Sequence, residues 1–140
     1  MNAVRRVGVC ALLAALSCLA IGCGVDQADT LVVRNDTEAS LDPGIFFSDS
    51  PDAFPAELLN TGLIAPGDSQ QFNFACAQLG AVMSDSAQLV LGGIVVAEAN
   101  DSAILTLGSD FGCGETIEFR YITVEGDLLI EVRVNGLLVD

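Results

Sequence analysis

Hydrophobic and polar residues alternate with a period of two over much of the chain after residue 29, which is the pattern of half-buried β-strands. The alternation is clearest over Thr116–Val124, where Ile, Phe and Tyr side chains share one face. Leu128–Val134 alternates in the same way, and the loop between the two runs is Glu125-Gly126-Asp127. A three-residue loop with a central glycine suits a hairpin. We therefore predict an antiparallel hairpin whose single tyrosine, Tyr121, faces the core.

The outward face of this hairpin carries charges of both signs. Pairing of Arg120 with Glu131, or of Glu118 with Arg133, would be favourable between neighbouring strands. Asn135-Gly136 is a further tight-turn signal, so that Leu137–Val139 is predicted to fold back as a short edge strand.

The rest of the body divides into short apolar runs bounded by Gly, Pro, Asn and Asp. These runs predict strands over Thr30–Asn35, Gly44–Ser48, Ser69–Phe74, Ala87–Ala99 and Ala103–Leu107. Gly92-Gly93 interrupts the long run, which is either one bulged strand or two strands about a turn. Two segments rich in Ala, Gln and Leu, Pro55–Asn60 and Cys76–Val82, are predicted to form one or two helical turns.

These elements together predict an all-β fold for residues 30–140. Seven or eight short strands without a long helix are typical of a single antiparallel β-sandwich. The stretch from Leu63 to Phe74 also resembles the turn-and-strand segment of extracellular immunoglobulin-like bacterial modules, in which a Pro-Gly turn leads into a strand of alternating aromatic residues. This resemblance supports an architecture and implies no activity.

The first 25 residues have a different character. Arg5 and Arg6 precede an uncharged, apolar run from Val7 to Val25, which is the pattern of a secretory signal helix. The run contains Ala20-Ile21-Gly22-Cys23, which resembles the lipobox of bacterial lipoproteins. The resemblance implies that residues 1–22 are a signal peptide cut away before Cys23, and that the Cys23 thiol carries a diacylglyceryl group. Residues 23–29 would then be the lipidated cysteine and a tether, with residues 24–29 spanning at most ~20 Å.

Three alternatives to this processing remain. Ala15-Leu16-Ser17-Cys18 offers an earlier cysteine, but cleavage there would leave an apolar stub on the mature chain. The apolar run also approaches the length of an uncleaved membrane anchor. Ordinary cleavage of the signal peptide, with release of the protein, is the third alternative. Lipidation at Cys23 implies attachment to the outer membrane or to the outer face of the cytoplasmic membrane.

The predicted export and lipidation determine which cysteines can form a disulfide. Loss of the signal peptide and lipidation of Cys23 leave Cys76 and Cys113, and an oxidising compartment favours a disulfide between them. The alternative is two separate buried thiols.

Composition excludes several reaction classes. The chain has 19 acidic residues, five basic residues, all of them arginine, and no histidine. Without His or Lys there is no Ser-His-Asp triad, Cys-His pair or lysine Schiff base. Removal of residues 1–22 takes away two arginines and no acid, so the mature net charge is 3 − 19 = −16. Such a polyanion is unsuited to nucleic acid, and its attachment to a membrane would depend on the covalent lipid.

Carboxylates are the plentiful reactive groups that remain. A glycosidase-like enzyme would need two of them across a cleft, and the spacing selects no pair. A calcium-dependent module would use loop oxygens, for which Asp49, Asp52, Asp101 and Asp110 are the weak candidates, with Asn100 beside them. Loop Asp and Asn residues more commonly form turns with their own backbone.

The sequence therefore predicts a non-enzymatic lipoprotein that acts as a binding or structural module near the membrane. It would contact an envelope protein, and we identify no catalytic residue, cofactor, nucleic acid or small-molecule substrate. The carboxylate enzyme and the calcium-dependent binding module are the alternatives. The overall pattern is similar to that of small bacterial lipoproteins, a resemblance that implies no particular activity.

Overall fold

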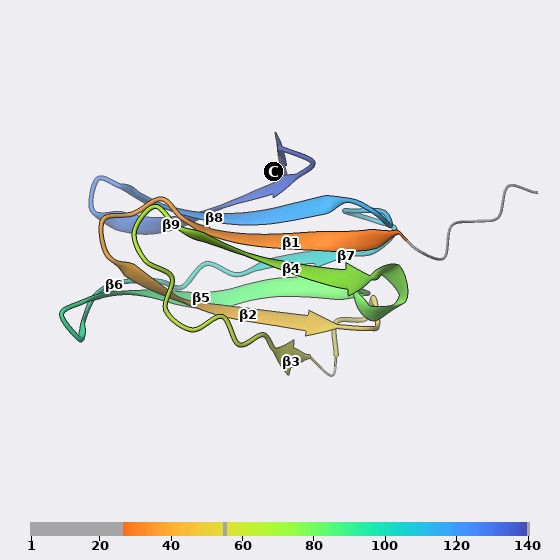
Figure 1. Ribbon diagram of the computed structural model, residues 1–140, viewed down its shortest axis with the longest axis horizontal. Coiled ribbons are helices and arrows are strands. Elements are labelled where there is room, and N and C mark those ends of the chain that lie inside the picture. The colour runs from red at the N-terminus through yellow and green to blue at the C-terminus, as the bar shows by residue number, and fades with distance from the viewer. Residues whose placement is uncertain (1–26, 55, 140) are drawn as a thin grey trace, which may run out of the picture.

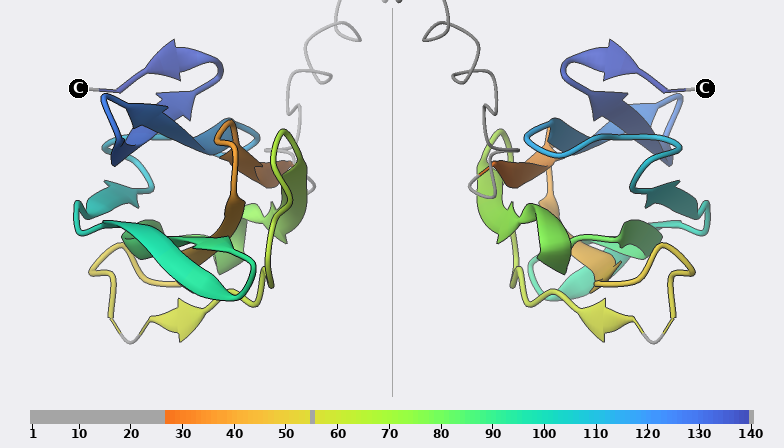
Figure 2. Two further views of the ribbon diagram at one scale, coloured as in Figure 1. Left: turned by 90° about the vertical axis from the view of Figure 1, so that its left-hand side faces the viewer. Right: turned by 90° about the vertical axis from the view of Figure 1, so that its right-hand side faces the viewer.

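A computed structural model describes residues 27–54 and 56–139. This part of the chain is all-β and sandwich-like, with two sheets of five strands stacked face to face (Figures 1 and 2). The strands are β1 (Ala28–Asn35), β2 (Ser40–Ser48), β3 (Glu57–Leu58), β4 (Ser69–Ala75), β5 (Ala81–Leu91), β6 (Ile94–Ala99), β7 (Ala103–Thr106), β8 (Thr116–Val124), β9 (Asp127–Val134) and β10 (Leu137–Leu138). A single 3-10 turn, η1 (Cys76–Gln78), follows β4.

The first sheet has the order β10-β9-β8-β1-β4. Its centre is the β8–β9 hairpin, and its far edge is β4, which is antiparallel to β1. The pairing of β1 with β8 is parallel, with Val33 beside Phe119. The prediction of a wholly antiparallel sandwich is therefore wrong at this one pair. Between β1 and β8 the chain crosses to the second sheet twice, with β4 of the first sheet in between. The parallel pair is therefore a long-range pairing that no local pattern specifies.

The second sheet has the order β3-β2-β5-β6, and β7 also pairs with β5. β5 pairs with β2 along one side, and its other side is long enough for two partners, since Ala81–Ser84 pairs with β7 and Ala87–Leu91 with β6. A register shift between Gly44 and Ile45 marks an irregularity in the β2–β5 ladder.

The core lies between the two sheets. The inward residues of the predicted β8 strand, Ile117, Phe119 and Tyr121, are fully buried, as expected from their alternation. They pack with buried residues of the second sheet, which include Leu41, Ile45, Val82, Leu89 and Leu105. Alternation in strands such as β1, β2 and β8 thus supplies one apolar face per sheet, and the two faces form one core.

Several predicted elements are confirmed. The β8–β9 hairpin is present, but its loop is the two residues Glu125-Gly126 and not the three predicted, because Asp127 begins β9 and pairs with Val124. Gly92-Gly93 separates two strands, β5 and β6. On the outward face, Arg120 pairs with Glu131 at 3.2 Å. Glu118 and Arg133 are register partners but form no ion pair with each other within the described residues, because Arg133 binds Glu131 at 3.0 Å.

Other boundaries are corrected. The described residues hold ten strands where seven or eight were predicted. The two-residue strand β3 was not expected, whereas the predicted edge strand Leu137–Val139 is present as β10, paired with β9. Pro55–Asn60 was predicted to be helical, whereas Glu57–Leu58 pairs with β2. Only Cys76–Gln78 of the second predicted helical segment forms a helical turn, since β5 begins at Ala81. β1 begins at Ala28, two residues before the predicted start.

The proposed signal helix and Cys23 lie outside the described residues. Over residues 27–54 and 56–139, no helix is long and apolar enough to cross a membrane.

Candidate functional site

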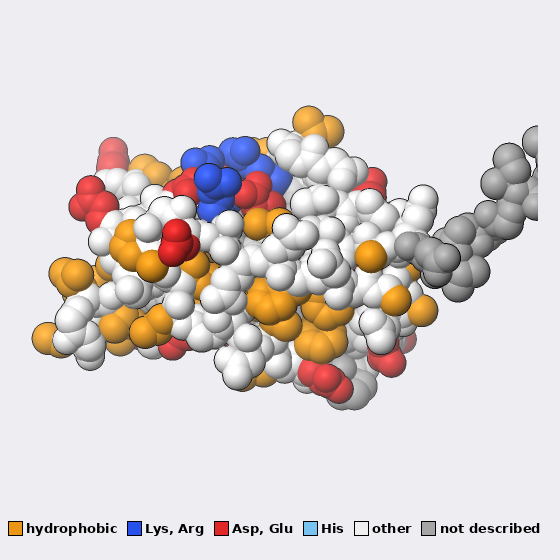
Figure 3. All heavy atoms as spheres, in the orientation of Figure 1, with side chains coloured by type: hydrophobic (Ala, Val, Ile, Leu, Met, Phe, Trp, Pro, Cys, Tyr) orange, Lys and Arg blue, Asp and Glu red, His pale blue; other side chains and the backbone are white. Residues whose placement is uncertain are grey.

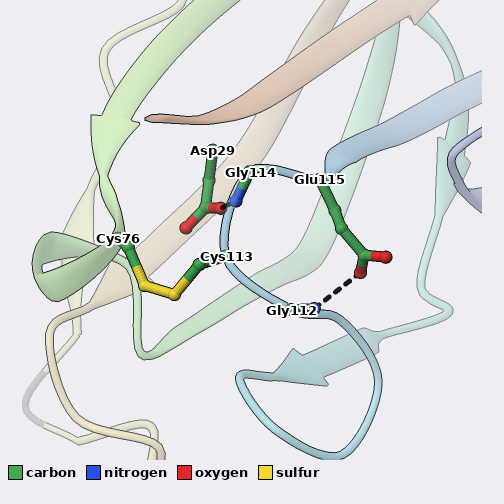
Figure 4. Close-up of a disulfide and its surroundings, with 6 residues drawn as sticks. All are labelled: Asp29, Cys76, Gly112, Cys113, Gly114 and Glu115. Atoms are coloured by element: carbon green, nitrogen blue, oxygen red, sulfur yellow. Dashed lines mark hydrogen bonds between the residues drawn. A yellow bond between two sulfur atoms is a disulfide. The ribbon is translucent and has the colours of Figure 1, made fainter. Parts of the chain in front are cut away.

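A disulfide joins Cys76 in η1 to Cys113 in the loop between β7 and β8 (Figure 4). The Cα atoms are 5.2 Å apart, and the two residues are separated by 37 positions in the sequence. The predicted pairing is confirmed. The bridge ties the end of β4 to the segment that leads into β8, and so fastens the two flanks of β1 at one end of the sandwich.

Carboxylates hold the backbone of this loop. The buried Asp29 Oδ1 accepts a hydrogen bond from the Gly114 N–H at 2.6 Å, and Glu115 Oε2 accepts one from the Gly112 N–H at 2.6 Å (Figure 4). Gly114 has a φ of 82°, which glycine adopts without strain. Gly114 therefore serves turn geometry next to the bridge.

The calcium candidates do not come together. Asp49 and Asp52 lie in the loop after β2, Asp101 lies between β6 and β7, and Asp110 lies after β7. Asp110 Oδ2 accepts hydrogen bonds from the N–H and Oγ1 of Thr106, at 2.7 and 3.0 Å, which is turn chemistry. No cluster of three or more His, Cys, Asp or Glu side chains suited to a metal occurs in the described part of the chain.

The three described arginines are gathered on the outward face of the first sheet (Figure 3). Hydrogen bonds from Arg34 and then Arg120 hold the pKa of Asp36 below its usual value. A general acid needs the opposite shift, because it must keep its proton near neutral pH. Asp36 therefore lacks the pKa shift of a general acid, and the cluster is an ion-paired surface.

A groove opens where the free sides of the two sheets meet, between β4 and the β2–β3 pair. Its volume is about 590 Å³, which is within the range of ligand sites. The residues that line it come from four segments of the chain and are Phe47, Ser48, Asp49, Glu57, Asn73, Phe74, Ala77 and Gln78. Figure 3 shows hydrophobic side chains at the surface between β4 and β2, with acidic side chains nearby.

Two phenyl rings form the apolar part of this groove. Phe47 of β2 and Phe74 of β4 are in a tilted contact, with ring centroids 5.1 Å apart. Both are only partly buried and pack against the core on one side. They bridge the two sheets and present ring surface to the groove.

Two carboxylates, Asp49 and Glu57, also line the groove. Each of the described arginines forms its ion pairs elsewhere, with Asp36, Glu118 or Glu131. Neither Asp49 nor Glu57 has an ion-pair or side-chain hydrogen-bond partner among the residues that the structure describes. The groove thus combines an apolar floor with uncompensated negative charge.

Sequence reasoning singled out Asp49 only as a weak metal ligand and missed the groove. The alternation of Phe72 and Phe74 correctly indicated a half-buried strand. That Phe74 meets Phe47 depends on the packing of one sheet on the other, for which the sequence carried no signal.

The chain matches no protein-family model, and no curated protein is similar to it in sequence. Function must therefore be inferred from the residues themselves.

Proposed function

We propose that this chain is an exported, lipid-anchored protein of the bacterial cell envelope whose β-sandwich is a non-enzymatic binding module. The address is inferred from residues 1–23. A basic pair followed by an apolar run and Ala20-Ile21-Gly22-Cys23 supports a lipoprotein signal, although Ala20 stands where leucine is usual in the motif. The disulfide between Cys76 and Cys113 supports export, because such bonds persist in oxidising compartments.

The groove between β4 and β2–β3 is the observation that carries the binding role. Half-buried aromatic surface that opens into a groove beside unpaired carboxylates favours contact with another molecule. A partner would contact this groove, and the covalent lipid would keep the domain close to its membrane.

The lipid anchor is tested by metabolic labelling with radioactive palmitate in a bacterial host. We expect label in the natural protein and in Cys18→Ser, and none in Cys23→Ser. We also expect the first two in the membrane fraction.

Label that is lost in Cys18→Ser but kept in Cys23→Ser would move the lipid to the earlier cysteine. Absence of label from all three proteins would refute the lipid anchor. Recovery from the cytosol with two reduced thiols would refute export.

A further inference from the structure

β4 is an edge strand, and backbone N–H and C=O groups on its outer side are free to pair with another strand. The N–H of Asn35 donates to Asp68 O, on the β4 side of β1, whereas the N–H of Thr30 donates to Glu115 O, on the β8 side. The backbone N–H and C=O groups of odd-numbered residues of β1 therefore point towards β4, and those of even-numbered residues point towards β8.

The register then places the free groups of β4. Gln71 pairs with Val32, and Asn73 pairs with Thr30. These two residues of β1, Val32 and Thr30, point their backbone N–H and C=O groups towards β8. In an antiparallel ladder the residues of such a pair both point their N–H and C=O groups away from each other. The backbone groups of Gln71 and Asn73 consequently point outward, along an edge that holds no proline or lysine to block pairing.

This edge runs into the groove, because Asn73 and Phe74 belong to both. A strand added to β4 would direct every second side chain towards the space above the Phe47–Phe74 pair. The groove would thus contact alternate side chains of the added strand, while the backbone of β4 would form hydrogen bonds with the backbone of that strand.

The charge of the groove indicates which side chains fit. Asp49 and Glu57 lack a cation among the described residues, and the whole chain has a net charge of −14. A long basic side chain can lay its methylene groups on a phenyl ring and place its charged end at a carboxylate. An acidic segment would be repelled from the same place.

We propose that the β4 edge and the groove bind an extended, basic segment of a partner protein by strand addition. The inference rests on the proposed role as a binding module, and it does not depend on where the lipid is attached. Backbone hydrogen bonds to Gln71 and Asn73 would supply affinity, and Asp49 and Glu57 would select Lys or Arg at alternate positions.

The direct test uses a fluorescent, end-blocked heptapeptide of sequence Thr-Lys-Val-Lys-Val-Lys-Thr and its counterpart with Glu in place of each Lys. The protein is the full-length product as the producing cell processes it, held in a neutral detergent. Fluorescence anisotropy at low ionic strength should show saturable binding of the Lys peptide only. The affinity should fall as salt is added. Equal binding of the Glu peptide, or no binding of the Lys peptide, would overturn the proposal.

Two variants locate the charge recognition. Asp49→Asn with Glu57→Gln should weaken Lys-peptide binding at least tenfold. Asp101→Asn with Asp127→Asn changes the net charge equally but lies outside the groove, and it should change the affinity less than twofold. Equal losses in the two variants would show that binding is non-specific attraction to a polyanion and would overturn the site.

Two further variants test the strand edge. Gln71→Pro removes an outward N–H without removing a donor to β1, so it should abolish binding while the thermal unfolding curve is retained. Gln71→Ala should bind normally. Unchanged affinity in a folded Gln71→Pro protein would overturn strand addition. So would light scattering that shows an unliganded dimer dissociated by Gln71→Pro, because β4 would then pair with a second copy.

These results are separable from the lipid anchor. A protein that incorporates palmitate but does not bind the Lys peptide would refute the proposed peptide site and leave the proposed attachment to the cell envelope unaffected. A protein that binds the Lys peptide but incorporates no palmitate would refute the lipid anchor and support the peptide site.

Discussion

At the scale of single residues, the buried polar groups form specific links across the molecule. Tyr121 of β8 and Ser84 of β5 are fully buried, and their hydroxyl oxygens are 2.8 Å apart. This hydrogen bond crosses the core and joins the two sheets. Asn35 is also buried, and its side-chain amide donates to Ala39 O and Ile64 O at 2.8 Å each. The bonds from Tyr121 to Ser84 and from Asn35 to Ile64 join residues 37 and 29 positions apart in the sequence, so they favour one packing of the chain.

Tyr121 gives a direct optical test of this burial. Burial raises the pKa of its phenol to about 12, although the hydrogen bond to Ser84 lowers it in part. The unfolded chain ionises near pH 10, so the stability contributed by the neutral phenol is complete below pH 10 and is lost as pH rises towards 12. The chain has one tyrosine and no tryptophan, and absorbance at 295 nm therefore reports this group alone.

We expect the folded protein to form phenolate near pH 12 and the protein in guanidinium chloride to form it near pH 10. Ser84→Ala should move the folded midpoint upward, because the hydrogen bond that lowers the pKa is lost. A folded midpoint near 10 would mean that Tyr121 is exposed to water.

At the scale of elements, local patterns predicted far more than long-range ones. The β8–β9 hairpin follows from alternation and an adjacent turn, and all of this information lies within Thr116–Val134. β3 could not be predicted, because Glu57 and Leu58 become a strand only beside β2. The groove could not be predicted either, since β2, β3, β4 and η1 meet only after the sheets have packed.

Gly80 shows how a tertiary contact overrides a helical pattern. The composition of Cys76–Val82 predicted a helical turn, but Gly80 lies against the end of β2. A Cβ atom at this position would be 2.5 Å from Asp49 O and from the Ser50 carbonyl carbon. The Gly80 N–H also donates to Ser48 O at 2.7 Å, and its carbonyl accepts from the Leu107 N–H at 2.8 Å. The chain can make this crossing only where a side chain is absent.

Gly80→Ala should therefore destabilise the fold by more than about 2 kcal/mol, since the atoms that would clash are backbone and cannot rotate away. Gly112→Ala is the matched control, because its Cβ would approach only the Glu115 carboxylate, at 3.8 Å. We expect the control to change the free energy of unfolding by about 0.5 kcal/mol or less. Urea denaturation followed by far-UV circular dichroism measures both, and equal effects would contradict the close packing at Gly80.

At the scale of the whole molecule, charge is distributed unevenly. The described arginines occupy one cluster with Asp36, Glu118 and Glu131, and the other described acids lie away from any cation. Solvent-exposed ion pairs each contribute only about 0–1 kcal/mol. Repulsion among the many unpaired carboxylates is spread over the surface and opposes the compact state.

This balance predicts that salt stabilises the protein. The screening length falls from about 30 Å at 0.01 M to about 8 Å at 0.15 M salt, so repulsion across the sandwich is largely removed while contacts within the arginine cluster persist. We expect the thermal unfolding midpoint to rise by a few degrees between these NaCl concentrations, and equally in KCl. Arg34→Gln should unfold at a lower temperature than the natural protein in 0.01 M salt, because it adds net negative charge and removes one of the two arginines that pair with Asp36. That difference should shrink as salt is added. A midpoint that falls with salt would mean that the ion pairs of the cluster outweigh the repulsion, and a constant difference for Arg34→Gln would mean that this arginine acts through packing and not through charge.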